Sequence, residues 1–223
     1  MLNPMPKTFD YNPPTTPWVS IIHADSDIVV LDKPSGLLTV PGKDPALSDS
    51  LETRVREQYP TATVVHRLDK DTSGILLMAL NKRALGFLGS QFEARKTKKS
   101  YVARVWGRIE GERGRVDLPL ATDWENKPRQ RVDHERGRAS QTEWEVIGRE
   151  ENATRVRLIP LTGRTHQLRV HMLAIGHPIL GDAFYATGEA LAAADRLQLH
   201  AEELGFTHPA DGKERHFVVP APF

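Results

Sequence analysis

Apolar residues recur in short runs along this 223-residue chain, and their spacing separates expected strands from expected helices. Alternating or continuous apolar runs of about four to eight residues are typical of strands. The clearest alternation is at 154–159, where Val156 and Leu158 share one face. Runs of this kind predict seven strands, at 27–32, 73–80, 101–106, 141–147, 154–159, 197–201 and 216–219.

Apolar positions three or four residues apart predict three helices. The first is expected to be capped by Ser48 or Asp49 and to continue to about Tyr59, before Pro60. The second covers about 82–95. The third covers 165–175, although part of that segment also has the period of a strand. We therefore expect an α+β fold, with a mixed, mostly antiparallel central sheet flanked by helices and loops.

The first twenty residues contain prolines at positions 4, 6, 13, 14 and 17 and lack the continuous apolar stretch of a secretory signal. They predict an extended arm over 1–20, followed by one domain over 21–223, because no change of composition marks a linker. The longest apolar runs are far shorter than the roughly 20 residues that span a bilayer. We expect a soluble, cytoplasmic protein that does not bind membranes.

Composition and charge narrow the functional classes. Cysteine is absent, which excludes disulfides and thiolate metal sites and argues against redox chemistry. The net charge is only +1, but residues 95–108 contain six basic side chains and no acid. Residues 127–138 contain five basic and two acidic side chains, and 155–171 contain four arginines and no carboxylate. This distribution favours a positive face that binds a polyanion, although solvated surface charges would give the same pattern.

Residues 66–69, His-Arg-Leu-Asp, place charge between two strand-like runs. Asp69 comes just before a Thr72-Ser73-Gly74 turn, and a loop resting on a rigid sheet can hold such a side chain in a cleft. A turn-capping aspartate with a solvated arginine neighbour is the structural alternative. The segment is therefore a candidate site that needs support from elsewhere in the chain.

That support comes from 161–171, where a glycine precedes a predicted helix rich in hydrogen-bond donors. Helix N-termini with arginines attract anions. His166 and His171 are five residues apart and do not form a zinc pattern, so we expect no metal site. Arg169 lies among apolar positions, where an unpaired guanidinium would be costly, and it should therefore have a carboxylate partner.

These segments together resemble the RluA family of RNA pseudouridine synthases. The His66–Asp69 segment with its Thr-Ser-Gly turn is similar to the family's H-R-L-D-x-x-T-S-G signature. Four further segments are similar in order and spacing to the remaining motifs of the family, at 33–37 (KPSGL), 99–101 (KSY), 162–171 (TGRTHQLRVH) and 176–182 (GHPILGD). The resemblance implies the pseudouridine synthase catalytic fold and isomerisation of uridine without a cofactor.

The resemblance also implies roles for single residues. Asp69 is the expected nucleophile, Arg169 its cationic partner, and Tyr101 the ring that stacks on the target uracil. The reaction breaks the bond between N1 and ribose and rejoins the base through C5. An ionised carboxylate can either attack the ribose or help to form an intermediate after proton loss at the sugar, and both routes stay open.

A uridine must leave its stack to reach such a carboxylate, and the resemblance implies that Arg67 fills the space it leaves. The remaining candidate substrate-binding residues are His66, Lys33, Lys98, Lys99, Arg104, Arg164 and His166. The expected partner is structured RNA, bound by a monomer without a separate S4 domain. The short chain is most similar to the family member that modifies both 23S rRNA, at position 746, and tRNA, at position 32.

Three alternatives remain at this stage. The first is action at a single rRNA or tRNA site. The second is a non-catalytic RNA-binding protein, which explains the charge but gives no purpose to Asp69, Tyr101 and Arg169. The third is a glycoside hydrolase that uses Asp69 with Asp71, and it leaves the basic segments unexplained. We interpret Asp71 as a surface turn residue.

Overall fold

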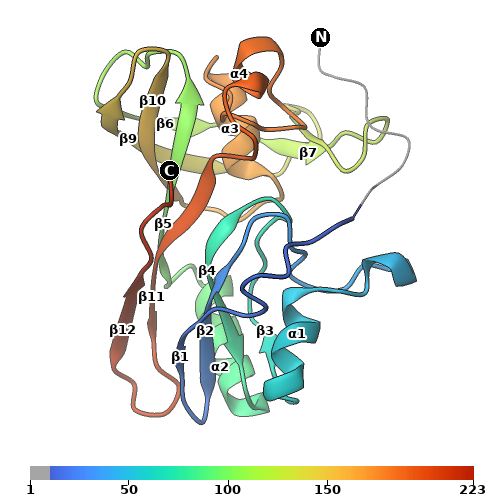
Figure 1. The fold of residues 1–223 in the computed structure, drawn as a ribbon. Coiled ribbons are helices and arrows are strands. Elements are labelled where there is room, and N and C mark those ends of the chain that lie inside the picture. Colours follow the sequence, from blue (N-terminus) through green and yellow to red (C-terminus); the bar gives the residue numbers. More distant parts are fainter. Residues whose placement is uncertain (1–10) are drawn as a thin grey trace. The chain divides into compact units, whose positions relative to one another are not determined.

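The computed structural model describes residues 11–223, and this part of the chain forms two compact units. One unit contains residues 11–99 and 200–222 and is called the Asp69 unit. The other contains residues 100–199 and Phe223 and is called the Arg169 unit. Figure 1 labels the helices and strands of both. Part of the arm expected over 1–20 lies outside the described residues, and the single domain expected over 21–223 stays a prediction.

The Asp69 unit is built on a mixed sheet. β2 is fully apolar except near its end, and it pairs in antiparallel fashion with β4, whose seven residues are all buried. β11 joins the other side of β4 in parallel, and the remaining pairs are antiparallel. The strands are β1 (Ile21–Ala24), β2 (Ile28–Lys33), β3 (Thr63–Val64), β4 (Ser73–Ala79), β11 (Leu199–Thr207) and β12 (Glu214–Val218).

Two α-helices belong to this unit, α1 (Leu51–Gln58) and α2 (Lys82–Glu93), together with a 3-10 turn at Pro45–Leu47. Ser50 caps α1 by accepting a hydrogen bond from the backbone N–H of Thr53, so the expected cap at Ser48 or Asp49 was wrong. Asp49 instead accepts two hydrogen bonds of 2.7 Å from Arg54. Because the Asp49 carboxylate is bound to Arg54, the cap at the start of α1 comes from Ser50.

Residues 11–20 contain no helix or strand and lie against α1. The buried Arg54 donates hydrogen bonds to the carbonyl oxygens of Pro14 and Trp18, and its guanidinium lies 4.0 Å from the centre of the Trp18 ring. The Tyr11 hydroxyl donates to the carbonyl oxygen of Asp49 at 2.7 Å. The described part of the expected arm is therefore attached to the Asp69 unit.

The Arg169 unit has an antiparallel sheet with strand order β5-β10-β9-β6 and a separate hairpin of β7 and β8. Side chains from these strands and from α3 enclose one apolar core, which includes Val105, Val156, Leu158 and Met172. The elements are β5 (Lys98–Trp106), β6 (Arg113–Asp117), β7 (Leu120–Thr122), β8 (Gln130–Val132), β9 (Gln141–Arg149), β10 (Ala153–Pro160), α3 (Gln167–Ala174) and α4 (Gly188–Ala192).

All seven expected strands and all three expected helices are present, with shifted ends, and the α+β class is confirmed. The segment with two possible periods forms the helix α3. Strands β1, β3, β6, β7 and β8 and the helix α4 were not expected. Within residues 11–223, no helix is long and apolar enough to cross a membrane.

Candidate active site

The loop that carries Asp69, residues 66–72, is held from one side by the segment that follows β2. The Lys33 ammonium donates hydrogen bonds to three backbone oxygens, those of Pro34 (2.9 Å), Leu37 (2.7 Å) and Lys70 (2.8 Å). Lys33 is fully buried. Burial lowers the pKa of the Lys33 ammonium to about 7, while the carboxylates of Asp71 and Asp69 act in the opposite direction.

Lys33 was expected to bind the RNA substrate, but its side chain lies in the interior of the unit. Its three N–H donors are all used by carbonyl oxygens inside the unit, and none of its surface is exposed. The residue instead joins the segment after β2 to the Asp69 loop. Its hydrogen bond to the Lys70 carbonyl oxygen holds the loop's backbone just after Asp69.

Two further contacts hold the same loop. Thr39 is buried, and its hydroxyl both donates to the carbonyl oxygen of Leu68 (2.7 Å) and accepts from the Leu68 N–H (3.2 Å). Ser35 donates to the carbonyl oxygen of Asp71 at 2.7 Å, and the Gly36 N–H donates to that of Lys70 at 2.9 Å. The backbone is thus fixed immediately before and after Asp69, whose own side chain is half-buried.

The end of the loop is joined to the C-terminal part of the unit. Gly74 has φ of +109°, and a Cβ atom there would lie 2.3 Å from the backbone oxygen of Ala201. Glycine is therefore required for the close parallel pairing of β4 with β11. The Ser73 hydroxyl and Nδ1 of His200 lie 2.9 Å apart, and Nε2 of His200 donates to the carbonyl oxygen of Val219.

His66 is also a structural residue. Its Nε2 accepts a hydrogen bond from the Leu77 N–H at 3.1 Å, and its ring stacks on Phe92 with centroids 4.6 Å apart. Burial, with the positive charge of Lys99, lowers the pKa of His66 to about 3. The imidazole is therefore neutral near pH 7 and supports the start of the Asp69 loop. The substrate contact expected for His66 stays a prediction.

In the Arg169 unit, Arg169 on α3 lies beside a buried acid. Asp182 accepts two hydrogen bonds from its guanidinium, from Nε at 2.8 Å and from Nη2 at 2.6 Å. Both side chains are almost completely buried. Oδ1 of Asp182 also accepts from the backbone N–H groups of Phe184 and Tyr185. The carboxylate partner expected for Arg169 is thus present, and it comes from the 176–182 motif.

Aromatic rings complete the surroundings of Arg169. Its guanidinium carbon lies 5.0 Å from the centre of the Phe184 ring and 5.1 Å from that of Tyr185. The Tyr185 hydroxyl accepts from the Gln130 N–H (2.8 Å) and lies 2.7 Å from Nδ1 of His166. His166 is left-handed, with φ of +53°, a conformation that costs about 1 kcal/mol or more in a residue other than glycine. His166 is buried beside Tyr185, and the substrate contact expected for it stays a prediction.

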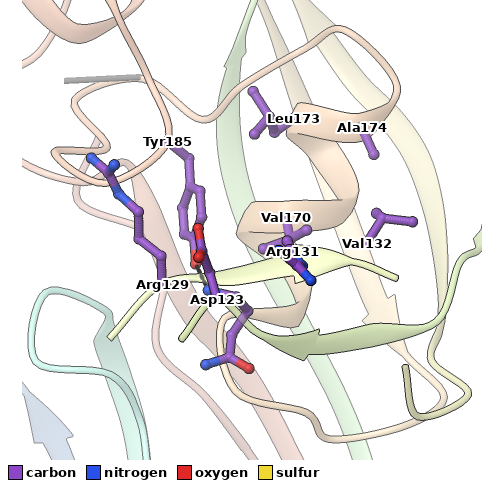
Figure 2. Close-up of a pocket in the computed structure, with 9 residues that line it drawn as sticks. Asp123, Arg129, Arg131, Val132, Val170, Leu173, Ala174 and Tyr185 are labelled. Atoms are coloured by element: carbon purple, nitrogen blue, oxygen red, sulfur yellow. Dashed lines mark hydrogen bonds between the residues drawn. The ribbon is translucent and has the colours of Figure 1, made fainter. Parts of the chain in front are cut away.

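Tyr185 is also a wall of a cavity of about 320 Å³ between β8 and α3. Figure 2 shows Val170, Leu173 and Ala174 of α3 facing Val132 of β8, with Tyr185 at the side. The remaining lining residues are Asp123, Arg129, Gln130 and Arg131. The hydrogen bond from Gln130 to Tyr185 therefore fixes one edge of the β7–β8 hairpin beside the Arg169 cluster.

The other basic residues that were expected to bind RNA differ in exposure and in whether a carboxylate pairs with them. Arg67 is exposed. Lys98 is exposed beside Glu214, at 3.4 Å. Lys99 is half-buried near Phe92, and burial lowers its pKa. The remaining two lie in the Arg169 unit, where the Arg104 guanidinium is paired with both carboxylate oxygens of Glu150 and Arg164 is half-buried next to α3.

The expected catalytic residues are divided between the units, with Asp69 in one and Tyr101 and Arg169 in the other. Their assembly into one site stays a prediction. Asp71 is half-buried and lies 3.2 Å from the Lys70 ammonium. Among residues 11–223, no group of three His, Asp or Glu side chains is arranged to hold a metal ion. Thr39, His200, Asp182 and Tyr185, which support the candidate residues, were not predicted.

Comparison with known proteins identifies the class. A family model described as RNA pseudouridylate synthase matches residues 27–174. Because this match covers most of the chain, including the Asp69 loop and α3, the chain belongs to the RNA pseudouridylate synthase family. It is accordingly an enzyme that isomerises uridine in RNA, and the resemblance found in the sequence is confirmed.

Several curated relatives share a more specific description. Proteins described as dual-specificity RNA pseudouridine synthase RluA are 55% identical over 215 residues in Salmonella typhi and 54% identical over 215 residues in Escherichia coli K12. Each match covers 96% of this chain and 98% of the relative. The relative from Vibrio vulnificus is 52% identical over 219 residues, or 96% of this chain and 88% of the relative.

Two solved human structures have the same fold. Human RNA pseudouridylate synthase domain containing 1 is 31% identical, with a TM-score of 0.77, over 92% of this chain and 84% of that chain. Human RNA pseudouridylate synthase domain containing 4 is 25% identical, with a TM-score of 0.72, over 91% of this chain and 88% of that chain. The expected pseudouridine synthase fold is thereby confirmed.

Proposed function

We propose that Asp69 is the nucleophile with which this enzyme converts uridine to pseudouridine in both rRNA and tRNA. The observation that carries the assignment is the way its loop is held. Buried side chains of Lys33 and Thr39 fix the backbone on both sides of Asp69 by hydrogen bonds. Such support is what a reacting carboxylate needs, because small displacements of a catalytic group reduce the rate strongly.

The reaction is a rearrangement within one nucleotide. The bond between C1′ of ribose and N1 of uracil breaks, the base turns, and C1′ joins C5, whose proton is lost while N1 gains one. No electrons are exchanged with another molecule. Asp69 either forms a covalent bond to C1′, as in retaining glycosidases, or assists a route in which the sugar gives a proton to a base and regains it when C1′ joins C5, and both routes use an ionised carboxylate.

Arg169 and Tyr101 act with Asp69 in this proposal. The guanidinium of Arg169 supplies a positive charge beside the carboxylate of the nucleophile. The bidentate contact with Asp182 fixes the plane of that guanidinium. Tyr101 packs on the target uracil.

RNA recognition combines base flipping with contacts to phosphate. The exposed Arg67 is two residues before Asp69, and we assign it to the space left by the flipped uridine. Lys98 and Lys99 supply affinity that is sensitive to salt and largely independent of sequence. Arg104 and Arg164 have the same assignment, and a phosphate would compete with Glu150 for Arg104.

The dual substrate range rests on the relatives described as dual-specificity enzymes, which match this chain over nearly its whole length. Action at a single rRNA or tRNA site is the second candidate. The RNA substrate also supports a cytoplasmic location and a monomer that binds a large RNA surface. Pseudouridine mapping of rRNA and tRNA from cells with and without the gene tests the range. Loss at both named positions is expected, and loss at one only would refute dual specificity.

The nucleophile is tested with Asp69→Asn and the matched control Asp71→Asn. Asp71 lies two residues further along the same loop and pairs with Lys70. We expect the first variant to bind a tRNA anticodon stem-loop with nearly unchanged affinity and to form no pseudouridine. The control should retain most of its turnover, because Ser35 holds this part of the loop through the Asp71 backbone oxygen, which the substitution leaves in place. Turnover by Asp69→Asn would exclude the assignment.

A further inference from the structure

The turn of the β7–β8 hairpin exposes a tryptophan. The Trp124 side chain is 74% exposed, the highest value among the exposed large hydrophobic side chains of residues 11–223. An indole in water loses the favourable free energy that burial of its large apolar surface would provide. Neither the fold nor the proposed catalytic chemistry uses this side chain. Its exposure therefore indicates that Trp124 contacts another molecule.

The turn that carries Trp124 is well ordered. The Asp123 N–H donates to the carbonyl oxygen of Arg129 at 3.0 Å, and the Asn126 and Arg129 N–H groups donate to the carbonyl oxygens of Asp123 and Asn126. The Asn126 side chain also donates to the Asp123 carboxylate at 2.9 Å. The hairpin edge is attached to the unit through Gln130 and Tyr185. The indole is therefore presented from a fixed support.

Lys127 covers one part of the ring. Its ammonium lies 3.8 Å from the ring centroid of Trp124, which is a cation–π geometry. With Lys127 over one face, the large exposed fraction leaves the opposite face open to a planar partner. Lys127 is itself exposed, so its charge remains available to a phosphate attached to that partner.

The charge balance favours stacking over phosphate binding as the main contribution. Residues 123–138 contain five basic and four acidic side chains, a net charge of only +1. Two of those acids are engaged within the hairpin region, Asp123 with Asn126 and Asp133 with the backbone N–H groups of Glu135 and Arg136. This near balance of charge weakens the electrostatic attraction between the hairpin and RNA phosphates.

We infer that Trp124 is a stacking platform for an unpaired nucleobase of the RNA substrate, a base other than the target uridine. The inference rests on the proposed function, since it assumes an RNA with unpaired loop bases. Base–aromatic stacking tolerates any base, because every base has a π face, and it is lost when the aromatic ring is removed. Trp124 would then help to hold the loop while the target base is out of its stack.

The test measures binding of a tRNA anticodon stem-loop to Asp69→Asn protein, so that binding is read without turnover. On this background Trp124→Ala should weaken binding roughly 5- to 150-fold, the range for loss of one stacked base. Trp124→Phe should keep most of the affinity. Phe87→Ala is the matched control, because Phe87 is an exposed aromatic of the other unit, and it should have no effect.

Two readouts distinguish stacking from charge. The fold-change caused by Trp124→Ala should be the same at low and high salt, and it should disappear with a blunt RNA duplex that has no unpaired bases. In addition, 2-aminopurine at one loop position should be quenched by the parent protein and by Trp124→Phe but not by Trp124→Ala. Equal losses on duplex and stem-loop would overturn the inference.

Unchanged RNA affinity in Trp124→Ala would also overturn it and would indicate a protein partner for this surface. Failure of the proposed function gives a different result, because the parent enzyme with Asp69 intact would then form no pseudouridine in the stem-loop. Binding and quenching by Trp124 are measured independently of that outcome.

Discussion

Asp182 fixes Arg169 from two directions, because one carboxylate oxygen accepts from Nε and the other from Nη2 of the same guanidinium. The pair is buried, and the same carboxylate also accepts hydrogen bonds from the backbone N–H groups of Phe184 and Tyr185. Removal of one partner from such a pair leaves an uncompensated charge in the interior. The position of Arg169 is thus set by a residue outside the α3 motif.

Asp182→Asn should keep the volume of the side chain but remove its charge and one acceptor. We expect a loss of about 3 kcal/mol in the free energy of unfolding and a fall of about 100-fold in kcat, because Arg169 is displaced. Urea unfolding and single-turnover kinetics measure the two effects. A variant with full kcat and unchanged affinity for the stem-loop RNA would show that Arg169 needs no such support.

Thr39→Val tests the two hydrogen bonds to Leu68 that position the Asp69 loop, because it removes them and keeps the packing of the side chain. Valine has nearly the same shape but leaves the N–H and the carbonyl oxygen of buried Leu68 without their partner, which costs about 2 kcal/mol. We expect kcat to fall at least about 10-fold with RNA affinity retained. Thr39→Ser keeps both hydrogen bonds and should restore kcat. If both variants are equally slow, the hydrogen bonds are not responsible.

Gly74→Ala should destabilise the protein by about 3 kcal/mol or more, because the new Cβ meets the backbone of Ala201 and φ is +109°. Gly86 offers an internal control. It lies within α2, and a Cβ there has no atom within 4 Å. Gly86→Ala should therefore stabilise by about 0.5–1 kcal/mol. Chemical denaturation of both variants is the measurement, and effects of the same sign would contradict the geometry at Gly74.

Lys33 makes stability depend on pH in the alkaline range. Its pKa is about 7 in the folded protein and 10.5 in an unfolded chain, so between these values the unfolded chain binds a proton that the folded chain has released. The free energy of unfolding therefore rises with pH in this window through Lys33.

Lys33→Met removes that contribution. We expect the free energy of unfolding of the wild-type protein, minus that of the variant, to increase from pH 7 to pH 10. Urea unfolding at each pH measures both values. The subtraction cancels other groups that titrate in the same range, such as Lys99. A difference that is constant over the whole range would show that Lys33 keeps its usual pKa in the folded state.

Much of the fold could be predicted because its buried strands are apolar runs. β4 is buried along its whole length and was expected nearly as found. β6 and β8 contain mainly arginine, glycine, glutamine and aspartate, so they have no apolar pattern that predicts a strand. Their pairing depends on neighbouring strands. The N-terminal end of α1 was misassigned because Ser48, Asp49 and Ser50 can all cap a helix.

The candidate site could be predicted only in part. The sequence indicated Asp69, and it required an acid for Arg169 without naming it. That acid is Asp182, 13 residues away and also placed among apolar positions, so the reasoning applied to Arg169 would have applied to it as well. No local feature of the sequence indicates that the Lys33 side chain is buried. Whether a lysine points to solvent or to backbone oxygens depends on how the loop closes around it.

The Asp69 unit is discontinuous in the sequence, because it combines residues 11–99 with residues 200–222. The parallel partner of β4 is therefore synthesised more than a hundred residues after β4 itself, with residues 100–199 of the Arg169 unit made before it is complete. During translation the nascent chain carries the nucleophile's loop without its neighbour strand. The sheet that carries the Asp69 loop is completed only when β11 leaves the ribosome, so chains that stop before β11 should form no pseudouridine.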